Sequence, residues 1–231
     1  MKFEKTWVGN FEGAIRGLRN PLASWDKSDS SWNKLTEEFE IGEKDLKLAQ
    51  KLIAAGSEHR KFMRQIFVCV DITAPIYWWK EASTYKIATV ANSTSTMHKL
   101  ASTPITLDCF EIDDFNDNLE YYEGNTVGMF FDLIIEQLEF LRQKYNETKD
   151  IRYWKELIRL LPESWLQKRT WSANYETLYS MILQRNQHKL ETEWGKGFIH
   201  WCTTLPYAKD LLFYGEEHQK IFNKYKAFEK Q

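Results

Sequence analysis

Apolar residues recur along this chain at two spacings, and each spacing predicts a kind of element. Between 126 and 145 they fall three or four residues apart, which is the spacing of one helix face. The same spacing predicts a helix over 43–55, with Gly56 at the place of a C-terminal cap. From 65 to 73 apolar residues alternate and also fill the intervening positions, which predicts a strand buried on both faces.

The remaining pattern predicts shorter elements between these. They are a strand over 2–8, an irregular loop over 21–34, a hydroxyl-rich loop over 89–96, and helices over 11–18, 76–83 (with Pro75 at its first position), 151–161, 171–190 and 191–203. Neither a repeat nor a linker interrupts them. The prediction is one α+β domain over residues 1–231, rich in helix and holding a small antiparallel sheet.

Composition narrows the function classes. Hydrophobic residues make up 43% and charged residues 28% of the chain, which excludes a disordered or low-complexity protein. Lys+Arg 31 against Asp+Glu 33 leaves no basic excess for a nucleic-acid polymer. The three cysteines are odd in number and far apart, which favours a reducing compartment. Without an apolar run of about 18 residues or a signal-peptide core, we expect a cytoplasmic protein that does not contact a membrane.

Sequence motifs for common chemistries are missing. A calcium-loop pattern begins at Asp114, but Leu119 and Asn125 occupy the positions that need Gly and Glu. The five histidines are scattered, so no metal site is predicted, and no catalytic residue can be assigned. Aromatic residues reach 15%, which fits either a large core with subunit contacts or a stacking surface for a planar ligand.

Two stretches of the chain resemble one enzyme family. The first runs from Leu52 through Gly56 and the strand ending in Ala-Pro-Ile76 to Leu100. The second contains Leu161-Pro162 and then a set of spaced residues: Trp171, Asn174, Leu178 and Arg185. In order and spacing, both stretches resemble the flavin-dependent thymidylate synthases.

The resemblance implies a fold, an activity and an assembly. Members of this family are single α+β domains that form homotetramers and bind FAD between subunits. Their reduced flavin mediates transfer of a one-carbon unit from methylenetetrahydrofolate to C5 of dUMP, and NADPH is the implied reductant. The expected ligands here are therefore FAD and a pyrimidine nucleotide.

The family's signature residues are largely replaced. Its Arg-His-Arg-x-x-Ser motif falls on residues 84–89, where Lys86 alone keeps a cation and Thr89 the hydroxyl. Its substrate loop, usually Glu-x-Ser-x-Arg, falls on 92–96 without the carboxylate or the arginine. By position, the implied cofactor contacts are Ser57, His59, Thr84, Tyr85, Lys86 and Asn174. The implied nucleotide contacts are Lys80, Glu81, Asn92, Ser93, Thr94, Ser95, Thr96 and Arg185.

These replacements leave two hypotheses open. In the first, the chain is an enzyme that acts on dUMP or has an altered substrate or product, such as a cytosine nucleotide, a differently phosphorylated pyrimidine or a hydroxymethylated base. Glu81, which stands where the family has a neutral amide, would accept from the exocyclic amine of cytosine. In the second, it is a catalytically silent relative that keeps the fold and oligomer and binds a nucleotide or protein partner. Taken alone, Lys80, Lys86 and Arg185 also fit solvated surface positions.

Overall fold

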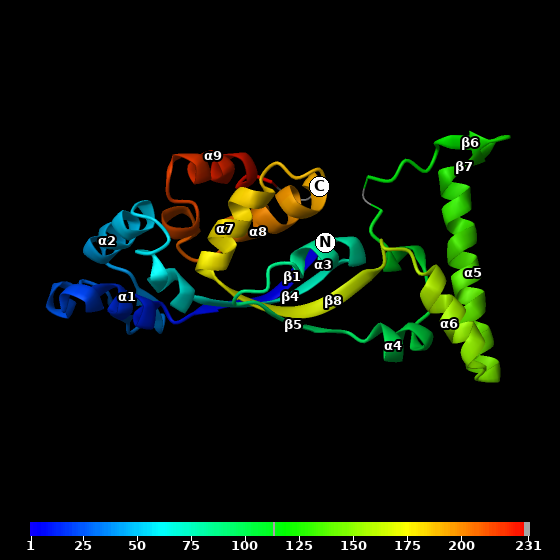
Figure 1. Cartoon of the computed structure of the whole chain (residues 1–231), viewed down its shortest axis with the longest axis horizontal. Helices are drawn as coiled ribbons and strands as arrows, with labels where there is room; N and C mark the ends of the chain where they lie inside the picture. Colours follow the sequence, from blue (N-terminus) through cyan, green and yellow to red (C-terminus); the bar gives the residue numbers. More distant parts are fainter. Residues whose placement is uncertain (113, 229–231) are drawn as a thin grey trace. The chain divides into compact units, whose positions relative to one another are not determined.

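The computed structural model (Figure 1) describes residues 1–112 and 114–228. Contacts between residues divide the chain into two compact units. Unit 1 contains Met1, Thr73–Thr84 and Asn92–Arg169. Unit 2 contains Lys2–Ile72, Tyr85–Ala91 and the chain from Thr170 onward. Each unit is therefore assembled from segments that are distant in the sequence.

A four-stranded sheet of order β1-β4-β8-β5 is built from Lys2–Gly9, Phe67–Pro75, Leu166–Asn174 and Val90–Ser93. Val68, Val70 and Ile72 are fully buried on one face of β4. The other face is only partly covered and Phe67 is 46% exposed, so the prediction of two buried faces is wrong for this second face. Two antiparallel hairpins complete the strands: β2 (Ser31–Asn33) with β3 (Glu38–Glu40), and β6 (Glu120–Tyr122) with β7 (Asn125–Thr126).

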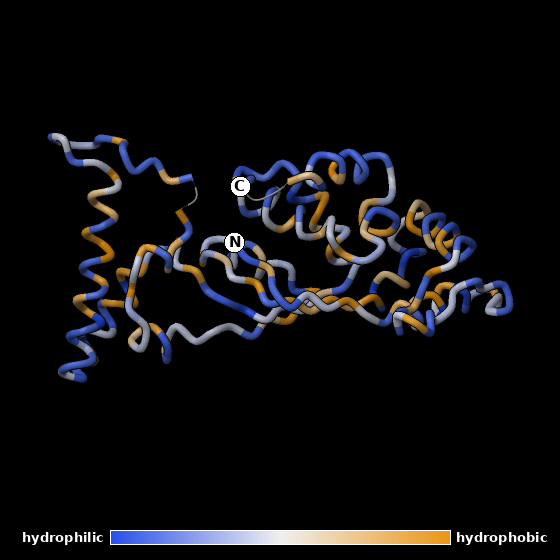
Figure 2. Tube along the Cα trace, turned by 180° about the vertical axis from the view of Figure 1, so that it is seen from behind, coloured by the Kyte–Doolittle hydropathy of each residue, from blue (hydrophilic) through white to orange (hydrophobic). Residues whose placement is uncertain are grey.

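Unit 1 has its helical core where α5 (Val127–Thr148) packs along α6 (Ile151–Leu160) (Figure 1). Apolar and polar stretches alternate along α5 (Figure 2). Its Leu138 and Leu141 are buried in a cluster that includes Leu157 of α6. The side chain of Thr126 caps α5 by accepting from the amide of Met129 at 3.2 Å. The helix predicted from the apolar spacing over 126–145 is thus confirmed.

Unit 1 also contains two shorter helices. They are α3 (Ile76–Ala82) and α4 (Thr96–Lys99). Pro75 is the N-cap of α3 rather than its first helical residue, one position from the prediction. Short 3-10 turns follow at Leu100–Ser102 and Leu107–Cys109.

Unit 2 gathers the other helices. They are α1 (Phe11–Arg19), α2 (Glu43–Ala54), α7 (Tyr175–Arg185), a π-helix at Glu191–Ile199, α8 (His200–Thr203), a second π-helix at Ala208–Leu212 and α9 (Glu216–Tyr225) (Figure 1). Short 3-10 turns lie at Asn20–Leu22, Trp25–Lys27 and Lys61–Gln65. Trp194 and Phe198 are fully buried and pack edge to face at 5.4 Å between ring centroids.

Several predicted boundaries are wrong. The helix expected over 171–190 begins only at Tyr175, because Trp171 and Ala173 are alternate buried positions of strand β8. The loop expected over 89–96 contains strand β5. Two 3-10 turns and β2 occupy the loop expected over 21–34, and the helix expected over 191–203 is mostly π-helix. Within the described residues, no helix combines the length and apolar content of a membrane span.

Candidate functional site

Arg185 is the last residue of α7 and belongs to a compact polar and aromatic cluster in unit 2. Its Nε donates to the hydroxyl of Tyr85 at 2.8 Å, and that hydroxyl donates to Gln184 Oε1 at 3.0 Å. The guanidinium carbon lies 4.6 Å from the ring centroid of Trp194 and 5.3 Å from that of Tyr85. Arg185 is therefore a partly buried cation held against two aromatic rings.

The edge of this cluster is formed by residues that follow Arg185. His188 lies 6.1 Å from Trp194 between ring centroids, and its Nδ1 accepts from the amide of Leu190 at 3.2 Å. Trp194 comes from the π-helix and is fully buried. The planar guanidinium of Arg185 is thus oriented by aromatic packing. From the sequence alone, Arg185 also fits a surface position.

Residues 84–86, where the family signature falls, have different surroundings. The Thr84 hydroxyl donates to the carbonyl of Glu81 at 2.7 Å, which places it in a local turn. Tyr85 contacts Arg185 as described. Lys86 is exposed and forms no ion pair with any described residue. Of these three residues, the structure therefore brings only Tyr85 to Arg185.

The remaining residues implied to contact the cofactor are in unit 2. Asn174 is the N-cap of α7, and its Oδ1 accepts from the amide of Thr177 at 3.0 Å and from the hydroxyl of Thr177 at 3.1 Å. This cap accounts for Asn174 structurally. Ser57 and His59 are exposed in the turn after α2, where Gly56 has a φ of 108°.

Lys80 and Glu81 lie near the C-terminal end of α3 in unit 1. The Lys80 ammonium forms an ion pair with Glu163, and both side chains are exposed. Glu81 is partly buried. The lysine therefore has a carboxylate partner already, which a phosphate would have to displace.

The hydroxyl-rich segment 92–96 is tied to strand β8. Thr94 donates through its amide at 2.9 Å and through its hydroxyl at 3.2 Å to the carbonyl of Lys168. The Gln167 side chain donates to the carbonyl of Thr94 at 2.9 Å and to the hydroxyl of Thr96 at 3.3 Å. Ser95 caps α4 by accepting from the amide of His98 at 3.3 Å. These groups serve the sheet edge and a helix cap, while Asn92 and Ser93 are exposed on β5.

Sequence reasoning missed Trp194 in unit 2 and Arg169 in unit 1. Trp194 stacks on Arg185. In unit 1, the guanidinium carbon of Arg169 lies 4.4 Å from the ring centroid of Trp79. The sequence gives little signal for either contact, because each joins residues at least nine positions apart whose pairing depends on tertiary structure.

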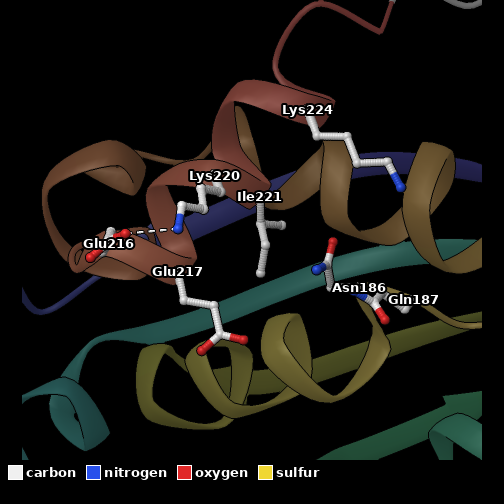
Figure 3. A pocket seen from close by; sticks show the side chains of 7 residues that line it. All are labelled: Asn186, Gln187, Glu216, Glu217, Lys220, Ile221 and Lys224. Atoms are coloured by element: carbon white, nitrogen blue, oxygen red, sulfur yellow. Dashed lines mark hydrogen bonds and ion pairs between the residues drawn. The ribbon is translucent and has the colours of Figure 1, made fainter.

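A pocket of about 580 Å³ opens in unit 2 between the end of α7 and α9 (Figure 3). Asn186 and Gln187 line it from the turn after α7, and the others come from α9: Glu216, Glu217, Lys220, Ile221 and Lys224. Its lysines are paired, Lys220 with Glu216 at 2.7 Å and Lys224 with Glu191 at 3.1 Å. Because these lysines are paired with carboxylates, the pocket carries no excess positive charge that would attract a phosphate. None of the site residues predicted from the sequence lines it.

The described residues contain no group of three or more His, Cys, Asp or Glu side chains placed to hold a metal ion. The three cysteines are free thiols, and burial raises the pKa of the Cys202 thiol. Burial likewise raises the pKa of Tyr175, whose hydroxyl donates to the carbonyl of Pro206 at 2.6 Å. Polar binding by cations, hydroxyls and aromatic faces is the chemistry that the candidate residues offer.

Comparison with known proteins identifies the fold. No protein-family model matches the chain, and no curated protein matches its sequence. Among solved structures, it is similar to the flavin-dependent thymidylate synthase ThyX from Helicobacter pylori complexed with FAD and dUMP, with 18% identity, a TM-score of 0.63, and coverage of 97% of this chain and 99% of that chain. A second structure of Helicobacter pylori ThyX with FAD and dUMP gives 18% identity, a TM-score of 0.66, and coverage of 95% and 100%.

The architecture is thus that of the flavin-dependent thymidylate synthases over almost the whole chain. The predicted fold class, helix-rich α+β with a small antiparallel sheet, is confirmed. At 18% identity the likeness shows the fold alone, because one fold can host many chemistries.

Proposed function

We propose that this protein is a flavin-dependent enzyme that transfers a one-carbon unit to a pyrimidine nucleotide. The observation that carries the proposal is the likeness, over 97% of the chain, to a thymidylate synthase that holds FAD and dUMP. The oriented guanidinium of Arg185 supports it, because this residue matches the family arginine that contacts the nucleotide. Methylenetetrahydrofolate as carbon donor, NADPH as reductant and a homotetrameric assembly are part of the same proposal.

The donor set suits FAD. Lys86 carries an exposed ammonium with no ion-pair partner among the described residues, so it can meet a phosphate of the cofactor. Thr84, Tyr85, Asn174, Ser57 and His59 are the further residues proposed to contact it. A reduced flavin would supply the electrons that the one-carbon transfer needs.

For the nucleotide, Arg185 is the proposed principal contact. The neutral side chains Asn92, Ser93, Thr94, Ser95 and Thr96 replace the family's charged substrate loop. Neutral donors bind phosphate less strongly than an arginine does, and Glu81 can only accept hydrogen bonds when ionised. We therefore propose that a cytosine nucleotide, whose exocyclic amine can donate to Glu81, binds better than dUMP. Lys80 would bind the phosphate of this nucleotide after releasing Glu163.

The colour of the purified protein tests the flavin part of this proposal first. We expect flavin absorbance bands in the visible region, either as purified or after FAD is added and excess is removed. Thermal shifts with mono-, di- and triphosphates of deoxyuridine and deoxycytidine, in the presence of FAD, then test the nucleotide part. Larger stabilisation by dUMP than by every cytosine nucleotide would refute the altered substrate and leave a plain thymidylate synthase.

A second candidate function is a silent relative that binds a nucleotide or protein partner without catalysis. The observation that favours it is the replacement of the family's Arg-His-Arg-x-x-Ser motif at residues 84–89, where Lys86 alone keeps a cation. Protein that stays colourless with added FAD, yet is stabilised by a pyrimidine nucleotide, would support this candidate over the enzyme.

A further inference from the structure

Arg169 occupies an unusual position on β8 in unit 1. Its guanidinium carbon lies 4.4 Å from the ring centroid of Trp79, which is itself buried. The indole Nε1 of Trp79 donates to the carbonyl of Gln167 at 2.9 Å, which fixes the ring against the strand. The guanidinium of Arg169 therefore lies over an aromatic ring that is hydrogen-bonded to the same strand, and Arg169 is partly buried.

The hydrogen-bond partners of Arg169 are all neutral. Its Nε donates to Gln167 Oε1 at 3.1 Å, and its Nη1 donates to the hydroxyl oxygen of Ser83 at 3.4 Å. Within residues 1–112 and 114–228, no carboxylate lies within ion-pair distance of it. Burial lowers the pKa of this arginine, with no opposing contribution from a nearby acid.

Two of the other partly buried arginines have carboxylate partners. Arg60 Nε lies 2.8 Å from Glu176, and Arg142 Nη2 lies 2.5 Å from Glu139. Withdrawing a charge from water is costly unless an opposite charge compensates it. Arg169 incurs that cost with neutral partners only, which is the state expected of a residue whose counter-ion arrives with a ligand.

We propose that Arg169 and Ser83 bind the oxyanion of a small molecule, a phosphoryl or carboxylate group. The guanidinium fork can donate two parallel hydrogen bonds to such a group. Ser83 is exposed and accepts from Arg169, so its own hydroxyl hydrogen is left to donate to the same anion. The inference concerns residues of unit 1 and holds whether or not the chain binds flavin.

Calorimetric titration of the full chain at constant ionic strength tests this site, with inorganic phosphate, pyrophosphate and acetate as probes. We expect at least one of these anions to bind, and R169Q to weaken that binding by roughly tenfold or more. R169K keeps the charge but loses the fork, so its affinity should lie between the two. A preference for phosphate over acetate, or the reverse, identifies the class of oxyanion.

The matched control is R152Q, because Arg152 is an exposed arginine that is already paired with Asp150 at 2.5 Å. It makes the same charge change and should leave anion binding unaltered. Arginine labelling of the unsubstituted protein with phenylglyoxal provides a second measurement that does not depend on the folding of R169Q. Phosphate should slow labelling of Arg169 relative to Arg152. Equal affinity of R169Q and the parent, no binding of any of the three anions, or equal labelling with and without phosphate would each overturn the proposal.

Discussion

Removal of the Asp45 carboxylate should destabilise the protein more than any exposed charge change. Asp45 on α2 is fully buried and accepts from Arg19 Nε at 2.5 Å, from the Ser28 hydroxyl at 2.5 Å and from the Ser30 hydroxyl at 2.6 Å. Arg19 itself is 5% exposed. Desolvation acts to raise the pKa of Asp45, but the hydrogen bonds from Ser28, Ser30 and Arg19 outweigh it, so the pKa lies below its ordinary value.

The size of the loss follows from what D45A leaves behind. D45A leaves the buried guanidinium of Arg19 without its partner. Removing one partner of a buried ion pair lowers the free energy of unfolding by about 3–5 kcal/mol. Two serine hydroxyls also lose their acceptor. With a urea dependence of about 2 kcal/mol per molar, a loss of about 4 kcal/mol lowers the unfolding midpoint by about 2 M.

Urea unfolding followed by tryptophan fluorescence measures this change. E43A is the matched control, because Glu43 lies on the same helix and forms an exposed ion pair with Lys47 at 2.6 Å; it should cost at most about 1 kcal/mol. Replacement of both buried partners, R19M with D45L, should recover much of the loss, since no charge is then left unpaired. If D45A unfolds at the same urea concentration as E43A, the assignment of a buried, stabilising pair is wrong.

Three further outcomes are expected. The Arg142 guanidinium and the amide of Ile105 bring the pKa of Glu139 down to about 2. Stability should therefore fall as pH decreases from about 4.5 towards 2, and the unfolding temperature of E139Q should depend less on pH in that range. R185A should weaken pyrimidine nucleotide binding by roughly tenfold or more in calorimetry, and unchanged affinity would exclude Arg185 from the site. K86M should lower the flavin content after FAD loading while K86R keeps it, as read from absorbance; equal content in both variants would remove Lys86 from the proposed FAD contacts.

The spacing of apolar residues was sufficient to predict an element where it fits a helix or a strand but not both. The spacing of apolar residues in α5 fits a helix and no other element, and the structure has Val127–Thr148 there. Around Trp171 the spacing of apolar residues fits two elements. Trp171, Tyr175, Leu178 and Ile182 fit a helix, while Trp171 and Ala173 also alternate as in a strand. Pairing of β8 with β4 and β5 decides in favour of the strand, and that pairing is not encoded in local spacing.

The candidate site shows the same division. Resemblance located Arg185, but its contact with Tyr85 joins residues 100 positions apart. Arg169 and Trp79 likewise meet only after β8 and α3 have folded. A single sequence contains no signal for such pairs, because the cation and the ring each look ordinary in their own neighbourhoods.

The interleaving of the two units has a consequence for the order in which they can form during synthesis. The chain passes between units after residues 1, 72, 84, 91 and 169, so neither unit is one continuous segment. All of unit 1 has been made once Arg169 is added, whereas unit 2 still lacks α7, the π-helix with Trp194, and α9. The N-terminal residues of unit 2 are therefore translated long before their core partners, and a ribosome-bound chain stopped after Arg169 should hold α1 and α2 without the tryptophan and phenylalanine that complete their unit.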